Sequence, residues 1–296
     1  MKIKTPPSRT AFMAFNYFIL SLITLSCILP ILHIFAISLS SGTAASAGKV
    51  AIWPVDPVLT AYSYLVSKKD FFHSVWISFM RVITGTIVNM FMIFITAYPL
   101  SRSVTEFRRR NAYMVYFAVT MFIGGGLIPT YMVIRYLSLI DNFWVLILPG
   151  AVNIWSVIIM MNFMRGIPRS LEEAAACDGA GHWRVLFQII LPVSLPSIAS
   201  LTLFAMINHW NSWFDGIFYM NNVNKYPLAT YLATQILSNN RNMTNMTPEL
   251  LAVLNRLSDK TVRSAELFIS IVPILVVYPF LQRYFVKGIV VGSVKE

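Results

Sequence analysis

The sequence predicts an all-α membrane protein with six transmembrane helices, and three observations lead to this prediction. Hydrophobic residues make up 57% of the 296 residues, and charged residues only 12%, whereas a soluble domain carries about 25% charged residues. The mean hydropathy is +0.66. Apolar stretches recur along the chain, and each is long enough for the ~20 residues that a helix needs to cross a bilayer.

The apolar stretches divide the chain into six predicted spans that form one bundle. We place these spans at about Tyr17–Leu39, Trp76–Leu100, Tyr113–Ile134, Phe143–Phe163, Leu195–Trp213 and Leu267–Phe285. Residues 17–285 then form the transmembrane domain, between an N-terminal tail at residues 1–16 and a C-terminal tail at residues 286–296. The first apolar run is longer than the roughly 7–15 residues of a signal peptide, so we interpret it as an uncleaved span.

Basic residues predict the orientation of the spans, because Lys and Arg accumulate in short cytoplasmic links. The link after the second span contains Arg102 and Arg108–Arg110, and the link after the fourth contains Arg165, Arg169 and Arg184. Both ends of the chain also carry basic residues, and six spans place all four segments on one side. We therefore expect a multi-pass protein of the plasma membrane with both termini in the cytoplasm. Because topology accounts for the net charge of +11, we expect no nucleic-acid partner.

A polar segment at residues 164–192 separates two apolar stretches on the predicted cytoplasmic side, and its sequence predicts a short helix. Ser170 and Glu173 have the spacing of a capping box, in which each side chain satisfies a backbone N–H at the helix start. The residues that follow are strong helix formers. The pair Asp178–Gly179 predicts the helix end, because Gly readily adopts the left-handed conformation that closes a helix. A cytoplasmic loop with this much local structure is expected to contact another molecule.

Groups that carry chemistry are sparse in this chain. Cys27 and Cys177 lie in different segments and predict neither a disulfide nor a metal site. The four histidines lack the spacing of a metal or catalytic motif. Gly42–Lys49 approaches a phosphate-binding loop, but its spacing is wrong by one residue and Val50 replaces the required Ser or Thr. We therefore assign no catalytic residue, no metal and no nucleotide site to the chain.

Three features within or beside the spans are candidates for a transport pathway or a partner contact. Arg81 lies in the second span, where an ionisable residue is a functional candidate, with a snorkelling Arg as the alternative. Gly125 and Gly126 belong to a run of three glycines that predicts either a broken stretch in the third span or simply its outer end. Trp210 and Trp213 fit an interfacial aromatic belt, and alternatively they could stack on a sugar.

The polar segment resembles the signature of a known family. Glu173-Ala174-Ala175, then Asp178-Gly179-Ala180, then Ile189-x-Leu191-Pro192 is similar to the EAA motif of permease subunits in ABC importers. One departure is that Leu186 occupies the place of the usual aromatic residue, with Phe187 after it.

The resemblance extends over nearly the whole chain. Gly125–Tyr131, Phe143–Pro149 and Tyr284–Gly288 look like segments of carbohydrate permeases related to the maltose importer's second permease subunit. Within these, the chain is most similar to the branch of polysaccharide or oligosaccharide permeases.

The resemblance implies the fold of a type I ABC importer permease, with a cytoplasmic coupling helix that docks into a groove on an ATPase subunit. It implies that this chain forms half of a translocation pathway for a sugar and needs no cofactor, since the partner binds ATP. The implied partners are an ABC ATPase dimer, a second homologous permease, an extracytoplasmic solute-binding protein and membrane lipid. The implied ATPase-coupling residues are Glu173, Ala174, Ala175, Asp178, Gly179, Ala180 and Pro192.

Two other classes of function are weighed against this one. An ion-coupled secondary transporter needs buried carboxylates within its spans, and none of the twelve acidic residues lies clearly in the middle of a span. A polytopic membrane enzyme needs acid, base or metal groups that face one another at one membrane depth, and the sequence shows no such set. The permease is therefore the preferred prediction.

Overall fold

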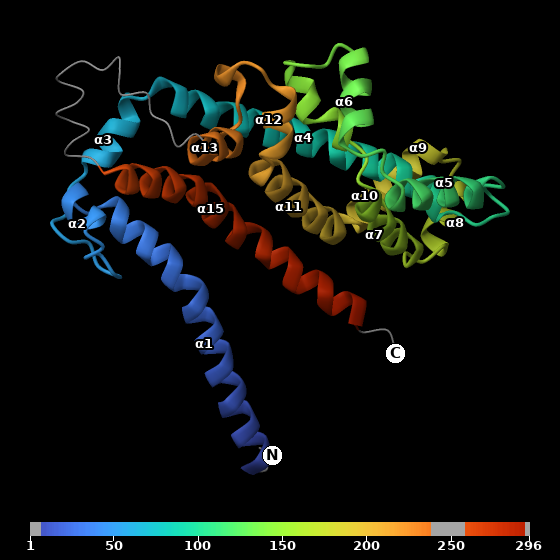
Figure 1. Ribbon diagram of the computed structural model, residues 1–296. Helices are drawn as coiled ribbons and strands as arrows, with labels where there is room; N and C mark the ends of the chain where they lie inside the picture. The colour runs from blue at the N-terminus through green and yellow to red at the C-terminus, as the bar shows by residue number, and fades with distance from the viewer. Residues whose placement is uncertain (1–6, 238–257, 294–296) are drawn as a thin grey trace. The chain divides into compact units, whose positions relative to one another are not determined.

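The computed structural model describes residues 7–237 and 258–293, and the regular structure in these ranges is entirely helical. The chain divides into two units, and Figure 1 labels most of their helices. The first unit contains α1 (Pro7–Ser38), α2 (Gly42–Ser46), α3 (Thr60–Ser67) and the part of α15 (Asp259–Ser293) that ends at Val272.

The second unit contains the remaining elements and the rest of α15. Its elements, in chain order, are α4 (Lys69–Ser101), α5 (Arg110–Phe122), α6 (Leu127–Tyr136), η1 (Phe143–Leu146), η2 (Leu148–Gly150), α7 (Ile154–Arg165), α8 (Ser170–Cys177), α9 (His182–Val185), η3 (Leu186–Ile190), α10 (Leu191–Val193), α11 (Leu195–Asn211), α12 (Phe214–Tyr219), η4 (Val223–Lys225) and α13 (Leu228–Leu237).

Within the described residues, three helices are each long and apolar enough to cross a membrane: α1, α4 and α15. Three further pairs of helices pass the same test only together, because each pair is bent at a short break. Counting each bent pair as one span gives up to six. The helices α1 and α15 also extend into the predicted tails, from Pro7 and as far as Ser293. The limits of the spans in the bilayer and the topology stay predictions.

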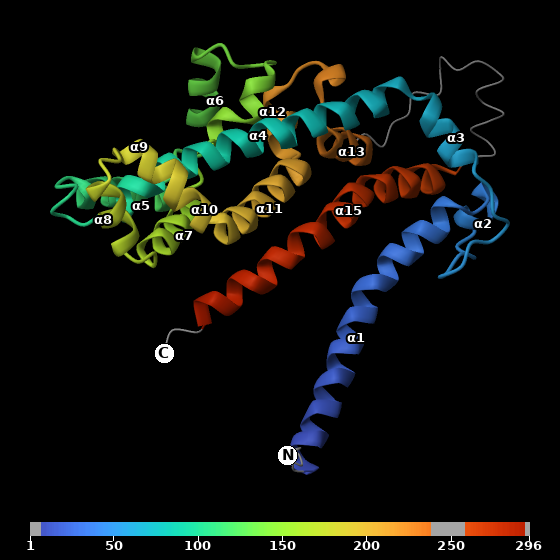
Figure 2. The same ribbon diagram turned by 180° about the vertical axis from the view of Figure 1, so that it is seen from behind.

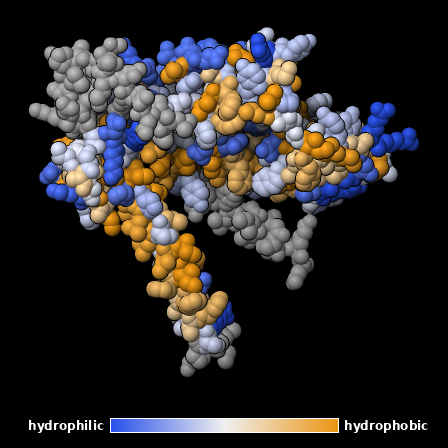
Figure 3. Space-filling view, in the orientation of Figure 1, coloured by the Kyte–Doolittle hydropathy of each residue, from blue (hydrophilic) through white to orange (hydrophobic). Residues whose placement is uncertain are grey.

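Helix α1 exposes apolar side chains on all sides over most of its length, as far as Phe35. Its apolar stretch has a mean hydropathy of 2.4, and none of it is buried inside the chain. Figure 3 shows these hydrophobic side chains along the length of α1. Because a helix that is apolar all round is stable only in an apolar environment, this surface fits lipid or another membrane helix.

The predicted third span is two helices rather than one. Helix α5 ends at Phe122, α6 begins at Leu127, and their axes differ by 114°. The break contains Gly126, whose φ of +78° lies in the region that favours glycine. The backbone is therefore broken at the glycine run, and the two alternatives for its depth in the membrane stay open.

The predicted fourth span is also interrupted, by a bend of 50° before α7. At this bend, Asn89 Nδ2 of α4 donates to the carbonyl groups of Gly150 and Ala151, each at 2.8 Å. Helix α7 then restarts with Asn153 as its N-cap, whose Oδ1 accepts from the amide of Ser156 at 3.0 Å. Polar side chains thus satisfy the backbone where the helix is interrupted.

The long helix α4 lies alongside α11, which Figure 2 shows from behind. Trp210 of α11 packs edge-on against Phe79 of α4, with ring centroids 5.3 Å apart. Gly85 of α4 leaves room for the His209 side chain of α11, because a Cβ atom built at Gly85 would lie only 2.5 Å from His209 Nε2. At the beginning of α13, the amide of Leu228 donates to Ser78 Oγ at 2.7 Å.

The largest hydrophobic core of the second unit joins α4, α7 and α11 to the polar segment. Helix α4 contributes Ile93 and Ala97, and α7 contributes Met160 and Met164. The polar segment contributes Ala175 of α8 and residues of α9 and η3 to the same core. The core therefore fixes one side of the segment to three predicted spans.

Candidate functional site

Helix α8 forms where the polar segment predicted it, but its start differs from the prediction. A capping box requires an N-cap at Ser170, and the N-cap is Arg169, which has a helical backbone and no side-chain cap. The amide of Leu171 instead donates to the carbonyl of Pro168 at 3.3 Å. The helical turn thus begins before Ser170, so Ser170 is the first helical residue and not the N-cap. The predicted capping role of Glu173 is therefore wrong.

The end of α8 confirms the sequence prediction. Gly179 has a φ of +76°, in the left-handed region. The amide of Ala180 donates to the carbonyl of Ala175 at 2.9 Å, and the amide of Gly179 donates to that of Ala176 at 3.0 Å. These two bonds define a Schellman motif with Asp178 as the C-cap. The motif turns the chain sharply and satisfies two carbonyl groups at the helix end.

One side of α8 faces the chain's own core and the other is free. Ala175 is 8% exposed and belongs to the core with α4, α7 and α11. Glu173, Ala174, Cys177 and Asp178 are exposed. The family resemblance implies that both Ala174 and Ala175 contact the partner ATPase. Only Ala174 is available for that role within this chain, because Ala175 packs inward.

An ion pair joins α8 to the segment that follows α4. Arg102 Nη1 donates to Glu172 Oε2, and both side chains are largely buried. The guanidinium also lies over the ring of Tyr98, 4.2 Å from its centroid, a cation–π contact. The core and the ion pair together hold α8 in one place relative to the end of α4.

Pro192 lies where the segment turns into the predicted fifth span. Because proline lacks an amide hydrogen, a regular α-helical bond cannot form at this position. The preceding turn, η3, is a π-helix in which the amide of Leu191 donates to the carbonyl of Leu186. The helices on either side of the following break, His182–Val193 and Leu195–Asn211, differ in direction by 81°. Pro192 therefore belongs to a bend between α9 and α11.

A groove of about 670 Å³ separates the end of α4 from α8 and α9. Its walls include Pro99 and Phe107 on one side, and Glu173, Ala176 and Trp183 on the other. Trp183 is 67% exposed. Motif residues and an aromatic side chain outside the motif thus line one groove.

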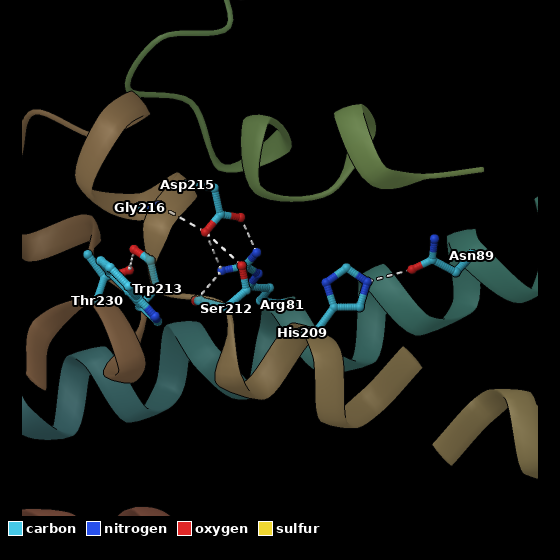
Figure 4. A network of polar contacts seen from close by, with 8 residues as sticks. All are labelled: Arg81, Asn89, His209, Ser212, Trp213, Asp215, Gly216 and Thr230. Atoms are coloured by element: carbon cyan, nitrogen blue, oxygen red, sulfur yellow. Dashed lines mark hydrogen bonds and ion pairs between the residues drawn. The ribbon is translucent and has the colours of Figure 1, made fainter. Parts of the chain in front are cut away.

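A second polar site surrounds Arg81, which is 2% exposed in the middle of α4 (Figure 4). Its guanidinium forms an ion pair with Asp215 and donates from Nη1 to the carbonyl of Ser212 at 3.0 Å. Asp215 Oδ1 also accepts from the Ser212 hydroxyl at 3.0 Å and from the amide of Gly216 at 2.9 Å. The snorkelling alternative is wrong, because Arg81 is buried and paired within the chain. It fastens the connection between α11 and α12 to α4.

The same two helices meet at a second polar contact. His209 Nε2 of α11 lies 2.6 Å from Asn89 Oδ1 of α4. The amide nitrogen of the same Asn89 holds the carbonyl groups at the bend before α7. One asparagine therefore links three predicted spans.

The other candidate pathway residues do not form one site. Trp210 is 8% exposed and Trp213 is 46% exposed. The carbonyl of Trp213 accepts from Thr230 Oγ1 at 3.0 Å, which fixes the backbone near the Arg81 site. Gly125 and Gly126 are exposed at the break between α5 and α6. The EAA residues lie together around α8, whereas the other candidates lie in separate places.

Sequence reasoning missed most of the partners in these sites. Asp215 follows a predicted span, Asn89 lies within one, and neither belongs to a recognisable motif. Glu172 directly precedes Glu173 and is not one of the matched motif residues, yet Glu172 makes the ion pair with Arg102. A polar residue in the middle of a span was an available signal for Asn89.

The fold and these sites define a class of protein. Up to six helical spans, a polar helix fixed to their core, and buried polar pairs between spans are features of a membrane transport subunit. Within residues 7–237 and 258–293, no three His, Cys, Asp or Glu side chains are grouped so that they could hold a metal ion.

Comparison with known proteins identifies the family. The model of the family described as "Binding-protein-dependent transport system inner membrane component" matches residues 7–291. The chain therefore belongs to this family. It is an integral membrane permease subunit of an ABC importer and not an enzyme.

Individual relatives match over most of their length. "Polygalacturonan/rhamnogalacturonan transport system permease protein YtcP" of Bacillus subtilis (strain 168) is 35% identical over 279 residues, which cover 94% of this chain and 96% of YtcP. "Protein LplC" of the same organism is 37% identical over 274 residues, which cover 90% of this chain and 89% of LplC.

A solved structure also matches. It is the crystal structure of a bacterial ABC transporter involved in the import of the acidic polysaccharide alginate. One of its chains is 31% identical to this one, with a TM-score of 0.87, and the match covers 96% of this chain and 100% of that chain.

We predict that Asp215→Asn destabilises the chain by about 3 kcal/mol, because loss of one partner leaves a buried charge uncompensated. Arg81 has a side-chain exposure of only 3%. The midpoint of thermal unfolding in detergent measures the effect. The control is Asp141→Asn, which weakens the exposed pair of Asp141 and Lys225 and should cost below about 1 kcal/mol. Equal shifts for the two variants would contradict a stabilising role of the buried pair.

We predict that Gly179→Ala destabilises α8 by about 1–2 kcal/mol, because a side chain disfavours the left-handed conformation. No atom lies within 4 Å of a Cβ built at Gly179, so the cost comes from the backbone alone. The midpoint of thermal unfolding and the rate of transport should both fall. Gly181→Ala is the matched control, since Gly181 has a φ of −74° and equal space. If the two variants behave alike, the left-handed turn is not required.

Proposed function

We propose that this permease subunit imports an oligosaccharide and that α8 is the contact through which a partner ATPase drives transport. The observation that carries this proposal is the two-sided nature of α8. Its inner side, with Ala175, is fixed in the core, while Ala174 on its outer side is exposed. A helix of this kind can bind a second protein and pass a movement inward.

The proposed mechanism follows from the contacts of α8. The helix is closed by the Gly179 turn, tied to Arg102 by Glu172, and embedded in the core by Ala175. A force applied to the outer side therefore moves α8 together with the ends of α4 and α7. ATP binding shifts the balance between conformations only if the ATPase contacts α8 differently in its two states.

The proposed partners are an ATPase dimer, a second homologous permease and an extracytoplasmic solute-binding protein. We infer that α8 faces the cytoplasm, because Arg102, Arg110, Arg165 and Arg169 line one pocket beside it. Such a concentration of arginine is typical of cytoplasmic links. With six spans, both termini then lie in the cytoplasm as well.

The proposed substrate class derives from relatives that match along nearly the whole chain. YtcP is named for polygalacturonan and rhamnogalacturonan, and the matched solved structure for the acidic polysaccharide alginate. We infer that this chain serves an acidic oligosaccharide. Trp213 remains a candidate for stacking on a sugar, because nearly half of its surface is exposed. Pathway roles for Arg81, Gly125, Gly126 and Trp210 also stay predictions.

For the coupling contact, we predict that Ala174→Trp abolishes uptake and reduces co-purification of the ATPase at least tenfold. Ala174 is exposed, so a large side chain should block the partner without disturbing the fold. The control is Ala47→Trp, which places the same side chain at an exposed position on the predicted outer side. Both variants should unfold at the temperature of the unmodified chain. Normal uptake with normal assembly in Ala174→Trp would refute the coupling role.

For the substrate, we predict that the reconstituted importer with its binding protein accumulates oligogalacturonides and does not accumulate neutral maltooligosaccharides. Uptake of a labelled acidic trisaccharide should be reduced by an excess of the unlabelled compound, but not by a neutral one of equal length. Transport of the neutral sugar alone would refute the acidic class while leaving the coupling role intact.

A further inference from the structure

A second pocket beside α8, of about 470 Å³, is lined mainly by charged side chains. It lies between the segment after α4, the first residue of α5, the end of α7 and the start of α8. The basic residues that line it are Arg102, Arg110, Arg165 and Arg169, and the acidic ones are Glu106, Glu172 and Glu173. Four positive and three negative charges leave a net charge of +1.

Two of the three carboxylates are already engaged. Glu172 pairs with Arg102. Glu106 Oε2 accepts from the amide of Ser103 at 3.1 Å. This backbone bond, followed by the Ser103 hydroxyl and the charges of Arg102 and Arg169, lowers the pKa of Glu106 although its partial burial opposes the shift. Glu106 is therefore ionised at neutral pH, so the net charge of the pocket is +1 at that pH.

Several arginine N–H groups in the pocket have no acceptor. Within the part of the chain that the structure describes, Arg102 Nε and Nη2 and Arg110 Nε are buried without a hydrogen-bond partner. A buried N–H group without an acceptor is unfavourable, and more so when it carries charge. Arg165 Nη2 already donates to the carbonyl of Leu100 at 3.2 Å. Among the described arginines of the pocket, the unsatisfied N–H groups therefore belong to Arg102 and Arg110.

A phosphate group has the chemistry that these residues require. Guanidinium N–H groups match phosphate oxygens in geometry and charge, and such bonds are stronger than neutral ones. A phosphodiester carries one negative charge, which cancels the net charge of the pocket. Basic pockets between transmembrane helices on the cytoplasmic side are known to accept lipid headgroups.

The surroundings favour a lipid over free phosphate as the source. The pocket adjoins the end of α4, which is one of the three long apolar helices. Helix α5 begins at Arg110 in the pocket and has no buried residue in the chain. Its Tyr113, Val115 and Val119 are each about half exposed or more. An acyl chain can therefore follow α5 while the headgroup occupies the pocket.

We propose that this pocket binds the phosphate group of an anionic phospholipid and that the bound lipid positions α8. Glu172 and Glu173 of α8 line the pocket, so a bound phosphate orders the arginines that hold this helix. The proposal rests on the cytoplasmic orientation proposed above. It concerns a lipid that remains in place, not the transported substrate.

The test uses the whole importer, purified with its ATPase and second permease, and native mass spectrometry of retained lipid. Phosphatidylglycerol should be retained in preference to phosphatidylcholine. The double variant Arg110→Gln, Arg169→Gln should bind phosphatidylglycerol about thirtyfold more weakly, since each basic side chain near a membrane surface contributes roughly fivefold. The control, Arg108→Gln, Arg109→Gln, removes two exposed charges from the same link and should retain the lipid.

Three outcomes would overturn the proposal. The first is equal retention of both lipids by the unmodified importer, or unchanged retention by the pocket variant. The second is displacement of the lipid by millimolar inorganic phosphate, which would make free phosphate the ligand. The third is loss of the ATPase from the pocket variant without loss of lipid, which would assign the arginines to protein docking. Because retention is measured without sugar, the result does not depend on the substrate.

Discussion

Backbone polar groups inside a membrane have no water to bind, so every interruption of a helix must be satisfied by the protein itself. In this chain the predicted third and fourth spans are bent pairs of helices, the predicted fifth span follows a bend of 81° after the polar segment, and α4 remains one long helix. Polar side chains of α4 bind backbone groups at one of these interruptions and at the end of α11. Asn89 binds the carbonyls before α7, and Arg81 binds the carbonyl of Ser212 after α11. The regular helix α4 therefore stabilises the irregular backbone of its neighbours by supplying these hydrogen-bond donors.

The same helix governs the proposed coupling site. Tyr98 lies in the last turns of α4, and Arg102, just beyond its end, stacks on this ring while it pairs with Glu172 of α8. Ala175 is buried with residues of α4 and α7. A helix held by one ion pair alone could swing, because an isolated pair contributes little. The packed core removes that freedom, since close-packed interiors transmit displacement.

Sequence reasoning was most successful where the cause is local. The Gly179 turn depends on the conformational preference of one residue, and the run of glycines that breaks the third span has a similar origin. It failed where the cause lies far away in the chain. Ser170 does not cap α8, because the preceding turn already supplies a helical backbone. Asp215 is separated from Arg81 by 134 residues, and only the packing of α11 on α4 brings them together. The EAA resemblance located α8, but not which of its alanines faces the core.

The separation of the two ion pairs on α4 has a mechanical consequence. Ser101 lies twenty residues after Arg81 in the chain, a rise of about 30 Å at 1.5 Å per residue, which is about the thickness of the hydrocarbon core. In the predicted topology, one pair fastens the connection to α12 near one face of the membrane, and the other fastens α8 near the opposite face. In the proposed mechanism the access of the pathway must alternate between these faces. A long helix to which both elements are fastened links the two faces without any change in its own hydrogen bonds. Transport then requires no catalytic residue in this chain, only rigid connections to a partner that hydrolyses ATP.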